Sequence, residues 1–220
     1  MANTLNLGNG NWATKEDSLL AYNSENGNFK PLPFDFTRAS SATVVNKAGL
    51  IETVGSGEPR IDFSNDAKGA LLLEPTRTNL VTYSEDLTTL TKTSTTITAN
   101  QAISPDGTLN ADEIIGTGFA RSSYTIGNGD ITVSCYVKSN DGSNNNFVFG
   151  AGSLGASGNS TFTATSEWQR FTHTFSTTAQ TTDFGFFATG GASLGLYLFG
   201  FHLEQGSYAT SYIPTQGSAV

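Results

Sequence analysis

After residue 80, the chain is a succession of short runs rich in β-branched and aromatic residues, separated by Gly, Asn and Asp. Runs of this kind, broken by turn residues at short intervals, are typical of antiparallel strands. Eight runs show the pattern, namely Ser94–Ala99, Ser122–Ile126, Asp130–Lys138, Asn146–Ala151, Ser160–Ala164, Trp168–Phe175, Thr182–Ala188 and Leu194–Leu203. We therefore expect residues 81–220 to form an antiparallel β-sandwich, with the jelly roll as the leading topology.

Two of these runs have patterns that predict burial. Leu194–Leu203 is apolar on both alternating faces, so we expect a central strand covered on both sides. Ile131–Val137 alternates, and it places Cys135 on its apolar face. The opposite, solvated face is expected to carry Thr132, Ser134, Tyr136 and Lys138. Cys135 is the single cysteine and has no basic residue adjoining it in sequence, so it is expected to be a small core residue rather than a reactive thiol.

The first 80 residues have few apolar side chains, and more of them are expected in connecting segments than in strands or helices. Such a segment cannot bury a sufficient core of its own. Thr14–Asn23 has a hydroxyl N-cap, acids in the first turn and an apolar run, which predicts one short helix. Short strands are predicted at Ala42–Val45, Leu50–Val54, Pro59–Phe63 and Ala70–Leu73. A turn at Asn46–Gly49 joins the first two strands as a hairpin. We expect an all-β chain in which residues 1–80 form an extended, mostly irregular region for attachment and oligomerisation.

Three arginines in this region stand beside short hydroxyl residues, a proline or a carboxylate: Arg38, Arg60 and Arg77. The guanidinium group has a rigid fork of donors, which suits bridging backbone carbonyls and carboxylates in chain that lacks regular structure. We predict that these arginines and the isolated Trp12 form assembly contacts.

Several segments resemble parts of one protein family. Thr165–Phe175 resembles the Trp-bearing strand of carbohydrate-binding-module-like jelly rolls, and Tyr197–Thr215 is similar to the last strand and tail of these modules in tailed-phage virion proteins. Phe36–Thr43 and Leu73–Leu80, followed by Tyr83–Asp86, resemble the segment that precedes the module in phage fibre and decoration proteins. The resemblance extends from about residue 32 onward. It implies a jelly roll displayed on a virion, and it does not imply one ligand.

The chain departs from that family at Leu87–Lys92. Members often carry an aromatic residue there, usually Trp, shortly after the Ser-Glu-Asp element. The missing ring weakens the transfer of a sugar-stacking role to the start of the module.

The resemblance leads to a first functional hypothesis, a capsid-attached decoration or head-fibre protein without enzymatic activity. Its partners would be capsid or other virion proteins, and it would be a homo-oligomer, with a trimer favoured. We expect no signal peptide, because the N-terminus lacks a basic and apolar segment. The protein is then made in the host cytoplasm and located on the virion surface. The alternatives are a tail-fibre or surface adhesin that binds host or environmental glycans through the jelly roll and, ranked last, a small glycoside hydrolase or lyase.

The net charge of −8 bears on the partners. An acidic surface poor in lysine repels phosphate backbones, so we expect no nucleic-acid partner. No long apolar segment is present, so we expect no membrane partner either.

Sugar binding needs exposed aromatic rings beside hydrogen-bonding groups. The predicted platforms are Tyr136, Trp168 and Tyr124, with Tyr197 and Phe119 as further rings. Core packing is the commoner role for a residue such as Trp168. Tyr136 lies opposite Cys135 and is therefore the better exposed candidate.

No catalytic constellation is visible, because His173 and His202 lie in strand patterns without a partnered nucleophile or acid nearby. No cofactor is required. Related carbohydrate-binding jelly rolls commonly carry a structural calcium, and Glu85 with Glu204 are the predicted contributors if the first and last strands are neighbours. The alternative, favoured for Glu204, is a buried ion pair with Arg77 or a bond to backbone amides near Asn79.

Overall fold

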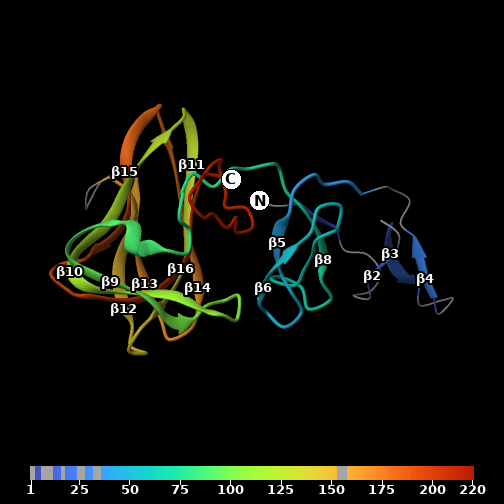
Figure 1. Ribbon diagram of the computed structural model, residues 1–220, viewed down its shortest axis with the longest axis horizontal. Coiled ribbons are helices and arrows are strands. Elements are labelled where there is room, and N and C mark those ends of the chain that lie inside the picture. The colour runs from blue at the N-terminus through green and yellow to red at the C-terminus, as the bar shows by residue number, and fades with distance from the viewer. Residues whose placement is uncertain (1–2, 6–11, 16–17, 24–27, 32–35, 153–157) are drawn as a thin grey trace. The chain divides into compact units, whose positions relative to one another are not determined.

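The computed structural model describes residues 3–5, 12–15, 18–23, 28–31, 36–152 and 158–220 (Figure 1). The predicted all-β class is confirmed: the only helical element in these ranges is a short 3-10 turn, η2, at Leu87–Thr89. The strands are β1 Asn3–Leu5, β2 Trp12–Lys15, β3 Ser18–Asn23, β4 Asn28–Pro31, β5 Ala42–Val45, β6 Ile51–Val54, β7 Ile61–Asp62, β8 Ala70–Leu73, β9 Thr91–Ile103, β10 Leu109–Ile126, β11 Gly129–Ser139, β12 Asn145–Ala151, β13 Asn159–Ala164, β14 Gln169–Thr177, β15 Gln180–Ala188 and β16 Leu194–Gln205. No helix in these ranges is long and apolar enough to cross a membrane.

The chain forms two compact units. Unit 1 comprises Met1–Thr76 together with Thr210–Tyr212, and unit 2 comprises Arg77–Ala209 with Ile213–Val220.

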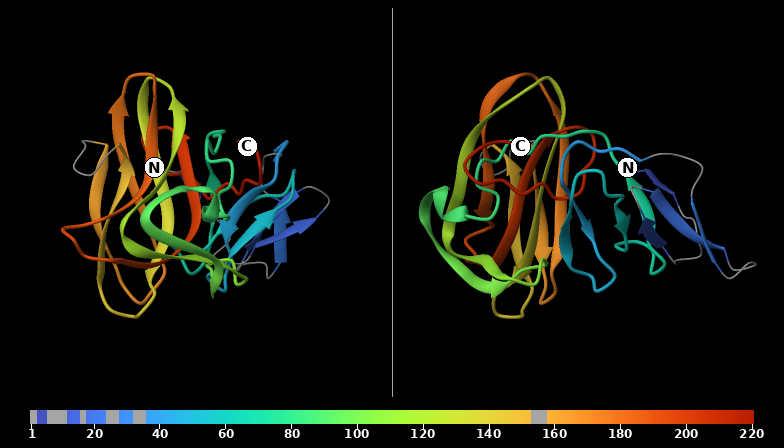
Figure 2. Two further views of the ribbon diagram at one scale, coloured as in Figure 1. Left: turned by 60° about the vertical axis from the view of Figure 1, so that its left-hand side comes forward. Right: turned by 45° about the vertical axis from the view of Figure 1, so that its right-hand side comes forward.

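Unit 2 is a jelly roll, as predicted. One edge of β10 pairs with β9, while its other edge pairs with β16 along its first half and with β15 along its second half. The front sheet therefore runs from the first half of β10 through β16 and β11 to β14. The back sheet runs from the second half of β10 through β15 and β12 to β13. Apart from the β12–β13 hairpin, each connection after β10 passes from one sheet to the other, which is the jelly-roll path (Figure 2).

Two glycines allow β10 to change sheets. A Cβ atom at Gly116 would lie 2.3 Å from the carbonyl oxygen of Ser94, and one at Gly118 would lie 1.8 Å from that of Thr93. The β9–β10 register also shifts between Gly116 and Phe119. Such an irregularity bends a strand, and here the bend falls where β10 passes from the front to the back sheet.

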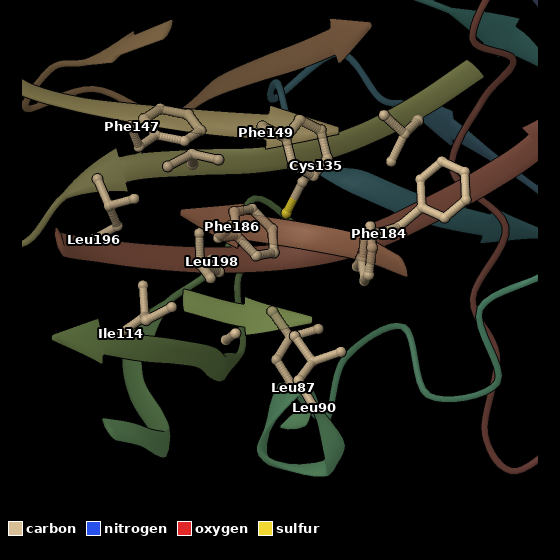
Figure 3. Packing of buried hydrophobic residues seen from close by; sticks show 14 of the residues in the cluster. Leu87, Leu90, Ile114, Cys135, Phe147, Phe149, Phe184, Phe186, Leu196 and Leu198 are labelled. Carbon is tan, nitrogen blue, oxygen red and sulfur yellow. The ribbon is translucent and has the colours of Figure 1, made fainter. Parts of the chain in front are cut away.

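The core lies between the two sheets and is rich in phenylalanine. Phe149 of β12 and Phe186 of β15 stack with ring centroids 4.8 Å apart. Figure 3 shows side chains of both sheets meeting in this core, including Leu198 of β16. Cys135 is fully buried in the same cluster, so its predicted core role is confirmed.

The predicted central strand is β16, and its burial on both faces is confirmed: every residue from Leu198 to Glu204 is buried. It lies between β11 and β10, and beyond β10 the segment Asn79–Ser84 continues along the same edge, where the Leu80 amide donates to the Leu203 carbonyl at 2.8 Å. The β11–β16 register shifts beside Gly200, which has φ +69°.

The solvated face predicted for β11 needs a correction. Thr132 and Ser134 are each 1% exposed, whereas Tyr136 and Lys138 remain partly exposed. The orientation is as predicted, but the Arg170 guanidinium donates to the Ser134 hydroxyl, and the Thr132 hydroxyl bonds to β14 and to the Gly206 carbonyl.

Unit 1 contains the predicted hairpin as β5 and β6, whose residues pair from Ala42↔Val54 to Val45↔Ile51. The short helix predicted at Thr14–Asn23 is wrong, because β2 and β3 pair as antiparallel strands there. An isolated helix of this length is marginal in water, whereas strand pairing satisfies the same backbone groups between neighbours. Within unit 1, Val44, Leu71 and Tyr212 are buried.

Candidate functional site

The outer face of the front sheet gathers the polar and aromatic side chains that point away from the core. In β11 and β14 the residues Tyr136 and Arg170 are cross-strand partners, and on the other side of β11 Lys138 is the partner of Tyr197 in β16. Trp168 directly precedes β14. The strand register therefore brings residues from three segments of the chain to one face.

We call the five side chains Tyr136, Lys138, Trp168, Arg170 and Tyr197 the aromatic–cation cluster. The Lys138 ammonium lies 5.5 Å from the ring centroid of Trp168 and 5.7 Å from that of Tyr197. The Arg170 guanidinium lies 5.5 Å from the ring of Tyr136. All five side chains are partly exposed. Cations at this distance are attracted by the ring quadrupole, so the cluster holds two cations against three rings at the protein surface.

The Trp168 indole also ties the cluster to the β9–β10 hairpin. Its Nε1 donates a hydrogen bond of 3.0 Å to the carbonyl oxygen of Ile103, at the end of β9. Ile103 and its register partner Leu109 are 61% and 62% exposed. The indole orientation is therefore fixed by a backbone acceptor, and an exposed apolar hairpin tip lies beside it.

Arg170 is held in position by polar side chains of the strands β11 and β16. Its Nη2 donates to the Ser134 hydroxyl at 2.9 Å and lies 3.4 Å from Nδ1 of His202. His202 is completely buried, and that burial, with a smaller contribution from the charge of Arg170, lowers its pKa well below the ordinary value. A neutral imidazole leaves Arg170 as the cation on this part of the face.

Hydrogen-bonding groups border the cluster on the β10 side. The Asn140 amide donates to Oε1 of Glu113 at 3.0 Å, and Glu113 is the cross-strand partner of Tyr197. A Cβ atom at Gly195 would lie 2.8 Å from Oδ1 of Asn140, so the glycine leaves room for that amide. Rings, an amide and a carboxylate on one surface are the groups that can stack on a sugar ring and bond its hydroxyls.

The structure brings together two of the three predicted sugar platforms, Tyr136 and Trp168. It does not bring Tyr124 to this face: its ring packs edge-on against Phe184 and Phe201 at 6.1 and 6.2 Å, and burial raises the pKa of its phenol. Tyr124 therefore lies outside this group of rings, and its role in sugar binding stays a prediction.

Sequence reasoning missed the two cations as members of the site. Trp168, Arg170 and the exposed Thr172 alternate along the start of β14, as Tyr136 and Lys138 do along β11. This alternation is visible in the sequence, but only the register of β11 with β14 shows that the two rows of side chains are adjacent.

The three predicted assembly arginines all bond within this chain. Arg38 donates to the carbonyls of Val54, at 3.1 Å, and Gly55. The guanidinium of Arg60 pairs with Glu74 at 2.7 Å. Nε of Arg77 lies 3.6 Å from Oε2 of Glu204. Bridging of carbonyls and carboxylates is thus seen within the chain, and the use of these arginines between chains stays a prediction.

Trp12 lies in β2 opposite Ala21, but its side chain is outside the described part of the structure. Its predicted role in assembly therefore also stays a prediction.

The two predicted calcium contributors have other neighbours. Glu204 is 1% exposed and its Oε2 lies 3.6 Å from Nε of Arg77, which is the alternative pairing considered for it. Glu85 accepts a bond of 3.4 Å from the Asn110 amide. Among the described residues, no group of three or more His, Cys, Asp or Glu side chains is arranged to hold a metal. Calcium binding stays a prediction.

The buried carboxyl of Asp112 has a structural role. It accepts hydrogen bonds from the backbone amides of Leu87, at 2.8 Å, and Asn100, at 3.1 Å. Burial raises its pKa, although both amide bonds oppose that shift. Asp112 thus ties η2 and β9 to β10. His173 is half-buried in β14 and bonds to the Ser160 hydroxyl at 3.1 Å.

Comparison with known proteins gives likenesses of fold only. No family model matches the chain, and no curated protein matches it. Among solved structures, the carbohydrate-binding module CBM6cm-2 from Cellvibrio mixtus lichenase 5A, in complex with cellotriose, is 14% identical over 58% of this chain and 98% of that chain, with a TM-score of 0.40. The family 11 carbohydrate-binding module from Clostridium thermocellum, in complex with a β-1,3-1,4-mixed-linked tetrasaccharide, is 14% identical over 65% of this chain and 99% of that chain, with a TM-score of 0.36.

A tandem CBM22-1–CBM22-2 domain from Paenibacillus barcinonensis Xyn10C is 17% identical over 60% of this chain and 46% of that chain, with a TM-score of 0.40. At such identities and scores, the function of this chain has to be inferred from its own side chains.

Proposed function

We propose that the jelly roll is a non-catalytic module that binds polysaccharide through the aromatic–cation cluster. The observation that carries the proposal is the gathering of three partly exposed rings, Tyr136, Trp168 and Tyr197, on the outer face of one sheet. Rings in a core would bury their whole area, and none of these three belongs to the core cluster between the sheets.

The geometry suits an extended ligand better than a small enclosed one. The cluster spreads over β16, β11 and the start of β14, so a chain of several sugars can lie across the strands. The hydrogen bond from Trp168 to Ile103 holds one ring in place before a ligand arrives. A preorganised ring reduces the entropy lost on binding.

The test is a glycan array probed with the full chain, followed by titration calorimetry of the bound polysaccharides. We expect Tyr136→Ala and Trp168→Ala to weaken binding by about tenfold or more, because aromatic anchors dominate binding energies. Trp168→Phe keeps a ring but loses the bond to Ile103, and it should fall between wild type and Trp168→Ala.

Thr125→Ala is the control for these variants, because Thr125 is exposed on the second half of β10, in the other sheet, where its hydroxyl bonds to Thr181. It should bind like wild type. Equal binding by folded Tyr136→Ala, Trp168→Ala and wild-type proteins would contradict the proposal, as would the absence of any glycan ligand.

The sequence resemblance supports a second proposal, that the module is displayed on a phage particle as a decoration, head-fibre or tail-fibre protein. The segments that carry it are Phe36–Thr43 and Leu73–Leu80, in the order in which they occur before the module. Low-resolution imaging of labelled particles tests the location, and mass photometry tests the predicted trimer. Absence of label from every particle would reject this second proposal without affecting glycan binding.

A further inference from the structure

The two cations of the aromatic–cation cluster lie in a part of the chain that has few basic residues. Residues 83–220 hold four basic side chains against ten acidic ones. Two of the four basic residues are engaged elsewhere: the Lys92 ammonium donates to the backbone carbonyls of Thr88 and Leu90, and Arg121 pairs with Asp183 at 3.1 Å. The other two, Lys138 and Arg170, both lie in the cluster. With Arg77, which pairs with Glu204, unit 2 has five basic side chains, and two of them lie on this one face.

Of the two cations in the cluster, Lys138 is the more available to pair with a charged ligand. Among the described residues, its ammonium contacts the rings of Trp168 and Tyr197 and forms no ion pair with a carboxylate. In the same cross-strand row, Glu113 is the partner of Tyr197, and its Oε1 accepts a hydrogen bond from the Asn140 amide. A lysine held between two rings without a counter-ion is available to pair with an anion from solution.

We propose that the cluster selects an acidic polysaccharide, one whose sugars carry carboxylate groups, and this inference rests on the proposed glycan-binding function. The rings stack on the apolar faces of the sugars while Lys138 pairs with a uronic acid carboxylate. Arg170 is the diagonal neighbour of Lys138 across β11 and β14, so its positive charge adds to the local attraction for an anion. A neutral glycan can accept hydrogen bonds from these side chains but has no charge to pair with the Lys138 ammonium.

The net negative charge of the protein opposes the binding of an acidic polysaccharide. An acidic protein repels a polyanion at long range, so the attraction has to be local and has to depend on individual side chains. Binding of a polyanion by plain charge attraction is not expected of this chain.

The experiment titrates the full chain with polygalacturonate and with the same polymer after chemical reduction of its carboxyl groups. We expect the uronate polymer to bind at least about tenfold more tightly than its neutral counterpart. Lys138→Gln should reduce that preference, measured as the ratio of the two affinities within the same variant. Lys92→Gln removes the same charge outside the cluster and should leave the preference unchanged.

Three outcomes would overturn the proposal. They are equal binding of the two polymers, an unchanged preference in Lys138→Gln, and binding of dextran sulfate as tight as that of polygalacturonate, which would show plain charge attraction. If the two polymers bind equally and Trp168→Ala abolishes the binding of both, the glycan-binding function stands and the preference for acids is wrong. If no polymer binds, the function itself is wrong.

Discussion

At the scale of single residues, buried polar groups determine what this chain tolerates. Arg60 and Glu74 form an ion pair of 2.7 Å with side chains only 8% and 6% exposed, and Ser211 bonds to both partners. Buried pairs are costly to break because the remaining charge is left without a partner. Sequence alone showed an arginine suited to such bonds, but it could not show that the acceptor is Glu74 of the same chain.

Arg60→Met is predicted to lower the free energy of unfolding by about 3–5 kcal/mol, because it leaves the Glu74 carboxylate buried without a cation. The matched control is Arg121→Met, which breaks a half-exposed pair with Asp183 and should cost less than about 1 kcal/mol. Urea denaturation of both full-length variants measures the difference. Similar losses in the two variants would contradict the buried character of the Arg60 pair.

A second prediction at this scale concerns His202 and pH. Glu204 lies 3.7 Å from its Nε2 and favours the charged ring, but burial dominates, aided by the charge of Arg170, and the folded-state pKa lies well below 6.5. The unfolded chain therefore binds a proton that the folded chain does not. The stability that the neutral His202 ring contributes is present above pH 6.5 and is lost as the pH falls below that value, by roughly 1 kcal/mol for each pH unit.

The measurement is the free energy of unfolding of wild type and His202→Gln at pH 7.5 and pH 5.5. The substitution is expected to cost stability at both values, so the informative quantity is the change with pH. That change should be smaller in the variant by the stated amount. An equal pH dependence of the two proteins would show that His202 is protonated in the fold.

At the scale of elements, the sequence predicts strands well where apolar residues alternate and turn residues stand between them. All eight predicted runs after residue 80 lie within or largely within one observed strand each, and these strands are β9 to β16. The run Ser122–Ile126 covers only the end of β10, because the first half of that strand contains Asp112, Glu113 and two glycines. Burial of Asp112 against backbone amides is a tertiary effect that no local pattern shows.

The two glycines give a prediction for this strand. Gly118→Ala should lower the free energy of unfolding by more than about 3 kcal/mol, because its Cβ would overlap the Thr93 carbonyl of β9 and force two paired backbones apart. The control is Gly142→Ala, where φ is +79° and nothing lies within 4 Å of the new Cβ. Its cost should be limited to about 1–2 kcal/mol of backbone strain. Equal thermal stability of the two variants would contradict the bend assigned to β10.

At the scale of the whole molecule, the boundary between the two units does not follow the order of the sequence. Thr210–Tyr212 come from the end of the chain but belong to unit 1. Tyr212 is 3% exposed there and its carbonyl accepts a bond from the Thr43 hydroxyl, while the Ser211 amide donates to Glu74 at 2.8 Å. The sequence indicated that residues 1–80 lack a sufficient core, but not which residues complete it.

A fragment of residues 1–80 is therefore expected to be unfolded, because it lacks Ser211 and Tyr212 and leaves Arg60 and Glu74 incompletely bonded. Circular dichroism and urea denaturation of this fragment measure the outcome, with the full chain as the control. A cooperative unfolding transition in the fragment would contradict the role given to the C-terminal residues.

The candidate site was predictable from the sequence only in part. Tyr136 follows from the alternation around Cys135, whereas Trp168 has the pattern of a core residue and only the fold places it beside Lys138 at the surface. Lys138 and Arg170 come together with the rings through strand register, which is set by pairing across long stretches of sequence.

Trp168 provides the most direct test of binding at this site. The chain contains two tryptophans, so Trp12→Phe leaves Trp168 as the only indole reporter. We expect a polysaccharide that binds the full chain to shift the fluorescence of Trp168 to shorter wavelength and to reduce its quenching by acrylamide, because stacking removes the ring from water. Binding confirmed by calorimetry with no change in Trp168 fluorescence or quenching would contradict the assignment of the aromatic–cation cluster as the glycan site.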